Sequence, residues 1–298
     1  MRIGIVVNPV AGGSRGAQVG AEVLSLLSKT EHAITDLSGT TLLETRSKIE
    51  ANLDSKSVDA LVFVGGDGIA HLGTNLCAGK NILMAIIPAG TGNDAAAMLG
   101  MPLSNTAESV RLVLEGLISP KKIDAIKVSH GGKVTWALGS ASAGFDALAA
   151  ARANAISWPK GPMRYYVAML LELAKFKPIK YQSVIDGTPR NFEAMLCVVS
   201  NTGIYGGGML VVPGASVTDA KLDVLLVKKM SRLKFVTIFP KVYKGTHITD
   251  KDVEIFKASK ISISASGMPI YSDGEYVGQA PFEAEVVSGA LTMVAPAI

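Results

Sequence analysis

The sequence predicts an α/β protein: a Rossmann-like parallel-sheet domain, then a mostly antiparallel β domain with two helices. Strand and helix patterns alternate over roughly the first 120 residues, and glycine-rich turns end two of the predicted strands. Short alternating strands dominate after residue 125. At 298 residues the chain is long enough for two domains. We expect the first over residues 1–125 with a C-terminal return over 287–298, and the second over 126–286.

The first domain is built from apolar runs that alternate between two periods. β-Branched runs predict strands over 3–7, 60–64 and 82–87, and helical spacing predicts helices over 19–27, 42–53, 72–77 and 107–117. Short connections between such elements predict a parallel sheet covered on both faces. Ligands of these sheets lie beyond the carboxyl ends of the strands.

The second domain reads as short strands separated by turn residues. Strands are predicted over 133–138, 180–185, 194–199, 222–227, 261–264 and 282–286. Glycine-containing turns lie between them, at 206–208, 212–214 and 273–274. Helical patterns at 162–175 and 231–241 interrupt the strands.

The composition excludes several classes of protein. A hydrophobic content of 48% with 18% charged residues is typical of a globular protein, not of a disordered one. Cys77 and Cys197 are isolated in apolar surroundings, which favours a reducing cytoplasm over a disulfide framework. No run of 18 apolar residues, zinc-ligand spacing or Gly-x-Ser-x-Gly motif occurs in the sequence. We expect a cytoplasmic protein.

The charge is unevenly distributed. Residues 151–250 carry 14 Lys and Arg against 6 Asp and Glu, whereas the remainder carries 15 against 19. A basic second half is consistent with an anionic membrane surface, with nucleic acid or with an ordinary solvated face. No arginine-rich tract or base-stacking motif is present, so we expect no nucleic-acid partner.

Three glycine-containing turns follow predicted strands and precede helices: 8–13, 65–68 and 90–94. Glycine lets backbone approach phosphate closely, and the free N–H groups of a first helical turn point towards an anion. Asp67 at a strand end could orient Mg²⁺ or hold a ribose hydroxyl. The first turn taken alone could equally be an ordinary βα loop. Two phosphate-type turns on neighbouring strands predict a bound nucleotide.

Two further segments carry carboxylates and hydroxyls. Asp273-Gly274-Glu275 reads most simply as a hairpin turn, because Asp-Gly is a common turn dipeptide. Its carboxylates could instead accept a proton from a substrate hydroxyl and help to hold a metal. The segment from Ser216 to Asp223 has oxygen ligands suited to Mg²⁺ or Ca²⁺, or it is a polar turn that enters a strand.

These motifs, with Pro88-Ala89-Gly90-Thr91-Gly92-Asn93-Asp94 and Tyr205-Gly206-Gly207-Gly208-Met209, resemble the diacylglycerol kinase catalytic family across nearly the whole chain. That family includes soluble bacterial diacylglycerol kinases and eukaryotic sphingosine and ceramide kinases. The resemblance implies a nucleotide domain and a β-rich lipid domain, with a last strand that returns to the first. It implies catalytic carboxylates at Asp273 and Glu275, with the choice of base left open.

The resemblance also implies a set of ligand contacts. ATP would be bound by residues of the strand ends, namely Asn8, Pro9, Gly12, Thr35, Gly65, Gly66, Asp67, Gly68, His71, Gly90, Thr91, Gly92, Asn93 and Asp94. Ser216, Asp219 and the backbone of Lys221 would match a structural Mg²⁺ site. The chain departs from the family pattern at Ile69, His71 and Leu72, where a hydroxyl and a carboxylate are lost. It also has Ala220 where the family has glycine.

We therefore expect an ATP- and Mg²⁺-dependent kinase that phosphorylates a lipid hydroxyl, with diacylglycerol as the leading acceptor. The alternatives are a kinase of a soluble acceptor such as NAD, which shares Gly-Gly-Asp-Gly, and a non-catalytic nucleotide- or lipid-binding regulator. A lipid substrate favours peripheral contact with the inner membrane face through residues 162–175 and 228–244, although both segments could equally be core helices. A homodimer is left open.

Overall fold

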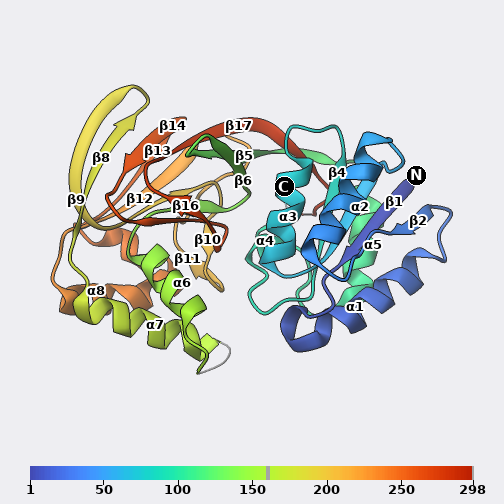
Figure 1. The fold of residues 1–298 in the computed structure, drawn as a ribbon, viewed down its shortest axis with the longest axis horizontal. Helices are drawn as coiled ribbons and strands as arrows, with labels where there is room; N and C mark the ends of the chain where they lie inside the picture. The colour runs from blue at the N-terminus through green and yellow to red at the C-terminus, as the bar shows by residue number, and fades with distance from the viewer. Residues whose placement is uncertain (159–161, 297–298) are drawn as a thin grey trace. The chain divides into compact units, whose positions relative to one another are not determined.

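The structure, a computed structural model, describes residues 1–158 and 162–296. The chain forms two compact units (Figure 1). The N-terminal unit comprises Met1–Ala125 with the segment that starts at Ser288, and the C-terminal unit comprises Ile126–Val287. Strands β5 (Lys121–His130) and β17 (Phe282–Met293) carry the chain from one unit to the other.

A parallel sheet forms the centre of the N-terminal unit. Its strand order is β2-β1-β3-β4 with the end of β17 added beside β4. The first four strands are β1 (Arg2–Val7), β2 (Ala33–Asp36), β3 (Ala60–Gly65) and β4 (Leu83–Pro88). In the added strand, Thr292 lies opposite Leu83. Strand β3 is buried along its whole length, as expected for a strand covered on both faces.

Helices cover this sheet, and side-chain caps set where some of them begin. They are α1 (Ala11–Leu27), α2 (Leu42–Asp54), α3 (Asp67–Cys77), α4 (Asp94–Met98) and α5 (Thr106–Gly116). Helix α1 packs against α5, and α2 packs against α3. At the start of α2, the Thr41 hydroxyl accepts a bond from the N–H of Glu44 at 3.1 Å, and the Glu44 carboxylate accepts one from the N–H of Thr40 at 2.8 Å. The first bond satisfies an N–H group that the helix cannot pair internally, and the second fixes the residue before the N-cap.

The C-terminal unit is built on antiparallel strands. Its main path runs β16-β15-β7-β9-β8-β14-β17, with β12 paired to β9 and β13, and β6 paired to β5. The bounds are β6 (Lys133–Ala137), β7 (Ser140–Ser142), β8 (Ile179–Ile185), β9 (Thr188–Ser200), β12 (Leu222–Lys228), β13 (Val253–Ala258), β14 (Lys260–Ser264), β15 (Pro269–Ser272) and β16 (Glu275–Gln279). A separate small ribbon consists of β10 (Ile204–Tyr205) and β11 (Met209–Leu210).

The C-terminal unit has three α-helices in its described part, where the sequence predicted two. They are α6 (Phe145–Ala155), α7 (Pro162–Lys175) and α8 (Arg232–Ile238), and 3₁₀ turns η1 (Phe239–Lys244) and η2 (Thr246–Thr249) follow α8. Helix α6 escaped prediction because six of its eleven residues are alanine, so no apolar stripe marks one face. Phe145 lies at the centre of the helical core, with the rings of Phe176 and Phe235 edge-on at 5.1 and 5.0 Å.

The fold class predicted from the sequence is confirmed: parallel strands in the first half, mainly antiparallel strands in the second. Among the described helices, none combines the length and the apolar character needed to cross a bilayer.

Candidate active site

The three glycine-containing turns of the N-terminal unit lie in contact at the carboxyl edge of the sheet. A side chain on Gly12 would come within 2.5 Å of the Ala89 carbonyl oxygen. One on Gly90 would come within 2.4 Å of the Cα of Gly66. Such distances exclude any side chain, so glycine is required for the turns to approach each other. The N–H of Ala89 also donates to the carbonyl of Gly65 at 2.8 Å.

The Gly90–Asp94 turn is held by one asparagine side chain. The Oδ1 atom of Asn93 accepts from the N–H of Gly90 at 2.8 Å, and its Nδ2 donates to the Gly90 carbonyl at 2.9 Å. Asn93 is 5% exposed and has φ of 59°, a left-handed conformation that asparagine tolerates better than most residues. Thr91 and Gly92 are exposed at the tip of the turn.

Asp67 connects this turn to the start of α3. Its Oδ1 atom accepts from the N–H of Ala95 at 3.1 Å. A side chain on Gly92 would lie 2.7 Å from its other carboxylate oxygen. Asp67 therefore lies beside exposed backbone at the first turn of α3, and Asp94 begins α4. This edge combines backbone N–H groups with two carboxylates, a combination suited to phosphates that carry a divalent cation.

Two of the departures from the family pattern are buried apolar residues, and one of them packs against the Gly65 turn. Ile69 and Leu72 are 6% and 7% exposed and belong to the core of the N-terminal unit. The His71 ring lies on α3 with its Nε2 atom 3.2 Å from the Nδ2 of Asn75. Replacing a hydroxyl and a carboxylate with Ile69 and Leu72 therefore adds apolar packing under the turns.

Thr35, which the resemblance places among the ATP contacts at the strand ends, is part of strand β2, where it pairs with Gly4. The residue from this region that bonds to the end of β1 is Ser38, whose hydroxyl accepts from the N–H of Val7 at 2.9 Å. The remaining residues of the first turn, Asn8 and Pro9, follow β1 directly, and the N–H of Asn8 donates to the Val64 carbonyl at 2.9 Å.

In the C-terminal unit, Asp273 is anchored to the backbone of another loop. Its Oδ1 atom accepts from the N–H groups of Gly139 and Ser140 at 2.8 and 2.9 Å, and its Oδ2 accepts from that of Leu138 at 2.8 Å. The N–H of Asp273 donates back to the Ser140 carbonyl at 3.0 Å. Both carboxylate oxygens are therefore directed at the chain between β6 and β7.

Asp273-Gly274 is also a hairpin turn. Asp273 and Gly274 have φ of 48° and 83°, and the flanking residues Ser272 and Glu275 pair across β15 and β16. This geometry is that of a type I′ turn, which requires positive φ at both central residues. Glu275 is exposed at the start of β16. Of the two predicted catalytic carboxylates, Glu275 is thus the one that faces solvent.

The segment predicted to hold a structural cation contains a lysine ammonium instead. Lys257 Nζ lies 2.7 Å from the Oδ2 of Asp219 and 3.2 Å from the Oδ2 of Asp223. The other oxygen of Asp219 accepts from the N–H of Lys221 at 3.0 Å, and the Ser216 hydroxyl lies 3.2 Å from that of Thr218.

An ammonium ion thus lies between the two carboxylates, and Mg²⁺ binding by Ser216, Asp219 and the backbone of Lys221 stays a prediction. Ala220 has φ of 56°, a conformation that glycine would adopt without strain. Within residues 1–158 and 162–296, no group of three His, Cys, Asp or Glu side chains is arranged to hold a metal.

A buried aspartate that the sequence did not indicate supports the glycine loop. The Oδ2 atom of Asp146 accepts from the Tyr205 hydroxyl at 3.1 Å, and burial raises the pKa of Asp146. The three glycines after Tyr205 have φ between 73° and 86°, which explains the run. Asp146 is the second residue of α6, and because that helix was not predicted, nothing in the sequence singled this aspartate out.

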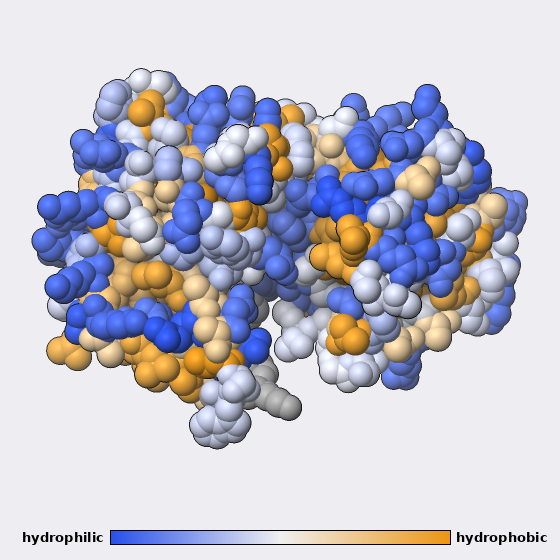
Figure 2. Space-filling model, viewed as in Figure 1, coloured by the Kyte–Doolittle hydropathy of each residue, from blue (hydrophilic) through white to orange (hydrophobic). Residues whose placement is uncertain are grey.

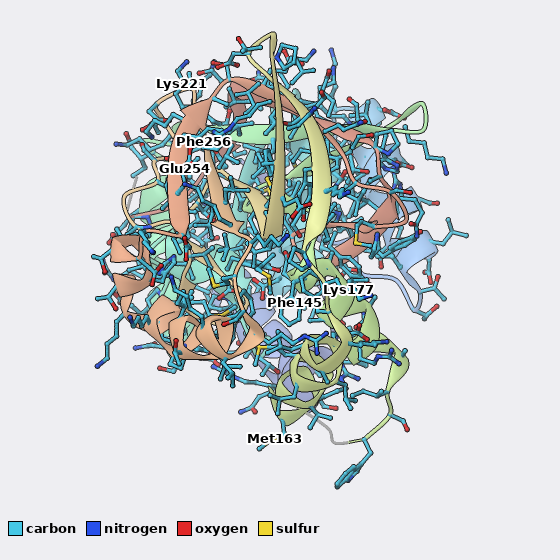
Figure 3. The ribbon with its side chains drawn as sticks, turned by 90° about the vertical axis from the view of Figure 1, so that its left-hand side faces the viewer. Phe145, Met163, Lys177, Lys221, Glu254 and Phe256 are labelled. Atoms are coloured by element: carbon cyan, nitrogen blue, oxygen red, sulfur yellow. The ribbon has the colours of Figure 1, made fainter. Side chains whose placement is uncertain are left out.

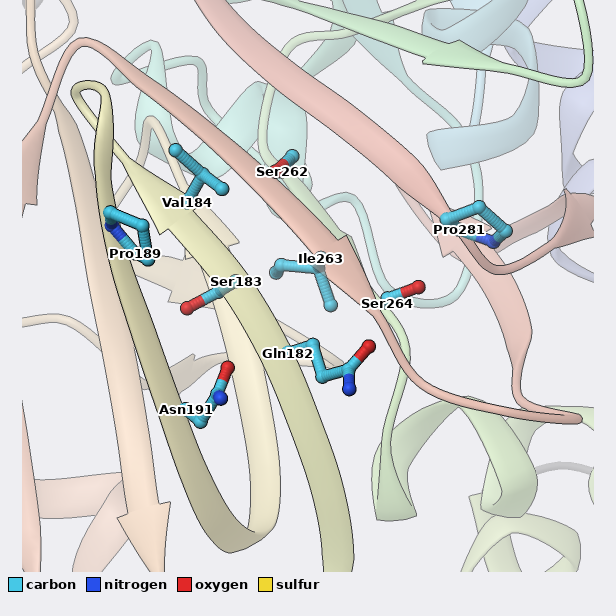
Figure 4. Close-up of a pocket in the computed structure, with 9 residues that line it drawn as sticks. All are labelled: Gln182, Ser183, Val184, Pro189, Asn191, Ser262, Ile263, Ser264 and Pro281. Carbon is cyan, nitrogen blue, oxygen red and sulfur yellow. The ribbon is translucent and has the colours of Figure 1, made fainter.

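Figure 4 shows a depression of about 290 Å³ on three neighbouring strands of the C-terminal unit. It is lined by residues of β8, β9, β14 and the segment before β17: Gln182, Ser183, Val184, Pro189, Asn191, Ser262, Ile263, Ser264 and Pro281. None of the candidate catalytic, nucleotide-binding or metal-binding residues named from the sequence lines this depression.

The arrangement defines the class of protein: an α/β unit with adjoining phosphate-type turns, followed by an antiparallel β unit. Residues 2–128 match the family described as "Diacylglycerol kinase catalytic domain". Residues 139–295 match the one described as "YegS C-terminal NAD kinase beta sandwich-like domain". This chain belongs to the diacylglycerol kinase and YegS-like family of lipid kinases, and it is a kinase.

Similar proteins span almost the whole chain. A "Diacylglycerol kinase" of Mycobacterium tuberculosis is 31% identical over 296 residues, covering 99% of this chain and 95% of the relative. A "Diacylglycerol kinase" of Bacillus subtilis is 25% identical over 291 residues, with 95% and 92% covered. The crystal structure of a diacylglycerol kinase from Bacillus anthracis has the same fold, with a TM-score of 0.72 at 22% identity and 99% and 97% covered.

Proposed function

We propose that this kinase transfers the γ-phosphate of ATP, bound with Mg²⁺, to the free hydroxyl of diacylglycerol, producing phosphatidic acid. The observation that carries the proposal is the contact between the Gly65–Gly68 and Gly90–Asp94 turns, where glycines admit backbone but no side chain. The names of the M. tuberculosis and B. subtilis relatives support diacylglycerol as the acceptor.

In this proposal the N-terminal unit binds the nucleotide. Phosphoryl transfer requires little covalent help from the protein; it requires aligned reactants and donors that neutralise developing charge. Backbone N–H groups at Gly66, Gly68 and Thr91 supply donors to the phosphates. Asp67 and Asp94 would hold the Mg²⁺ that enters with ATP, which would neutralise charge on the phosphates, and no step depends on a cation beside Asp219.

The C-terminal unit supplies the proton acceptor. We assign this role to Glu275, because it is exposed whereas both oxygens of Asp273 accept backbone N–H bonds. The acceptor hydroxyl gives its proton to Glu275 as its oxygen bonds to the γ-phosphorus, and the bond to the β–γ bridging oxygen breaks to release ADP. Asp273 keeps the hairpin and the 138–140 segment in position. This unit would bind the lipid, at the surface of the membrane that holds it.

An acceptor panel tests the proposal. Purified protein with Mg²⁺ and γ-labelled ATP is incubated with diacylglycerol, monoacylglycerol, sphingosine, ceramide, phosphatidylglycerol and NAD. The proposal predicts labelled phosphatidic acid and little other product. Labelling of NAD alone would establish the soluble-acceptor kinase, and labelling of ceramide or sphingosine alone would reassign the lipid.

A further inference from the structure

Helix α7 is apolar on the side that faces away from the core as well as on the side that packs into it. Ala168 and Leu173 face the core at 0% and 6% exposure, whereas Met163, Leu170 and Leu171 are exposed at 59%, 58% and 51%. Figure 3 shows Met163 at the end of α7 far from the sheet. Apolar residues all round a helix are typical of one that lies between two apolar environments.

The one acidic residue of α7 does not interrupt this outer side. The Glu172 side chain is 8% exposed, and its carboxylate lies 2.6 Å from the Nε of Arg152 and 3.4 Å from the Nζ of Lys175. The acid therefore faces inward and is neutralised there. Among the described side chains of α7, the outer side carries no negative charge.

Helix α8 extends the same surface. Leu233 and Val236 are exposed at 82% and 46%, while Phe235 and Ile238 on the opposite side are buried. The Arg232 guanidinium donates to the Phe176 carbonyl through Nε at 3.1 Å and Nη2 at 3.0 Å, so the start of α8 is fixed to the end of α7. Figure 1 also places the two helices side by side.

We call this surface the α7–α8 face and define it by its exposed apolar residues, Met163, Leu170, Leu171, Leu233 and Val236. Figure 2 shows hydrophobic residues gathered over these helices at the lower left, interleaved with hydrophilic ones.

Positive charge borders the α7–α8 face. Residues 228–244 contain six Lys and Arg and no Asp or Glu; three of the six, Lys228, Lys229 and Lys234, are paired with carboxylates outside the segment. Arg232 donates to backbone carbonyl oxygens, which do not neutralise its charge. Lys241 and Lys244 are exposed beside Tyr243. Apolar side chains with cations and an aromatic ring at their margin are the pattern of a surface that lies in the headgroup region of an anionic bilayer.

We propose that the α7–α8 face docks on an anionic lipid bilayer, with its leucines among the upper acyl chains and its lysines against the headgroups. The proposal rests on the proposed function, because diacylglycerol is confined to the bilayer. A second copy of the chain is a poorer occupant, since pairing two such faces would bring like charges together.

Vesicle flotation tests the docking. Wild-type protein is predicted to float with phosphatidylcholine vesicles that contain phosphatidylglycerol, and far less with pure phosphatidylcholine. The variant Leu170→Gln/Leu171→Gln/Leu233→Gln should bind at least about tenfold more weakly, because three apolar side chains lose their burial in lipid. The pair Lys241→Gln/Lys244→Gln should lose most of the dependence on phosphatidylglycerol. Leu43→Gln and Ile118→Gln, at residues 75% and 87% exposed in the N-terminal unit, are matched controls and should bind as wild type.

The readouts separate this proposal from the proposed function. The triple leucine variant should phosphorylate short-chain diacylglycerol, dispersed as monomers, at the wild-type rate while losing activity on vesicles. If the protein phosphorylates no lipid but floats as predicted, the proposed function fails and the docking stands. The docking proposal is overturned if wild-type protein does not float, if the triple variant floats equally well, or if sedimentation shows a dimer that the triple variant dissociates.

Discussion

The carboxylate of Asp273 accepts the backbone N–H of Gly139 at 2.8 Å, a contact between residues 134 positions apart. A side chain on Gly139 would lie 3.0 Å from the same oxygen, so the glycine allows the aspartate to approach. With the bonds from Leu138 and Ser140, this contact fixes the β15–β16 hairpin to the loop between β6 and β7.

Asp273→Asn and Glu275→Gln should therefore fail in different ways. The asparagine amide group would face an N–H donor, leaving a buried donor unpaired, so we expect a loss of about 1–3 kcal/mol in the free energy of unfolding. Glu275→Gln removes an exposed proton acceptor, so we expect unchanged stability and a fall in kcat of about 10²–10⁴. Thermal melts and steady-state kinetics of both variants check this. A stable, inactive Asp273→Asn enzyme beside an active Glu275→Gln enzyme would reverse the assignment.

The cost of replacing a glycine where the two turns meet should increase as the distance from its added Cβ to the nearest atom decreases. A Cβ on Gly90 would lie 2.4 Å from backbone, whereas one on Gly66 would lie 3.1 Å from its nearest neighbour. We expect Gly90→Ala to cost about 1–3 kcal/mol of stability and to weaken ATP binding, with Gly66→Ala milder on both counts. Calorimetric titration with ATP and denaturant unfolding measure the two effects. Equal tolerance of both substitutions would show that the turns are not closely packed.

Lys257 should make divalent cations dispensable for the stability of the C-terminal unit. Wild-type protein is expected to melt at the same temperature in EDTA and in Mg²⁺. Lys257→Met leaves the carboxylates of Asp219 and Asp223 facing each other, so the melting temperature should fall in EDTA and recover with Mg²⁺. Lys260→Met, which removes another half-exposed ion-paired lysine in the same unit, is the control and should show no such recovery. A wild-type protein that EDTA destabilises would contradict this arrangement.

His247 should make the protein less stable in mild acid. Its ring is 1% exposed, its Nε2 atom lies 2.8 Å from the Val211 carbonyl oxygen, and burial lowers its pKa. Because the unfolded chain binds a proton near pH 6.5 and the folded chain resists it, stability falls as the pH drops below 6.5. The slope contributed is at most about 1.4 kcal/mol per pH unit. His247→Gln should remove this part of the pH dependence of the free energy of unfolding, measured by urea titrations at pH 7.5 and 5.5. An unchanged pH dependence would show that it comes from other groups.

The sequence predicted that the N-terminal turns lie together, because parallel strands bring their carboxyl ends to one edge of the sheet. Motifs far apart in the chain therefore had to meet there. The sequence could not predict that Asp273 binds the backbone of residues 138–140, since those N–H groups come close to its carboxylate only through the pairing of β7 with β15. The ammonium of Lys257 was hidden in the same way: it lies opposite Asp223 in the register of β12 and β13, which no local pattern specifies. Helix α6, and with it Asp146, lacked the apolar periodicity from which a helix is predicted.

A crystal structure with a non-hydrolysable ATP analogue and Mg²⁺ would test the proposed nucleotide site most directly. We expect the triphosphate to lie against the backbone N–H groups of residues 65–68 and 90–94, with Asp67 or Asp94 facing the metal. A triphosphate bound away from both turns would contradict this expectation.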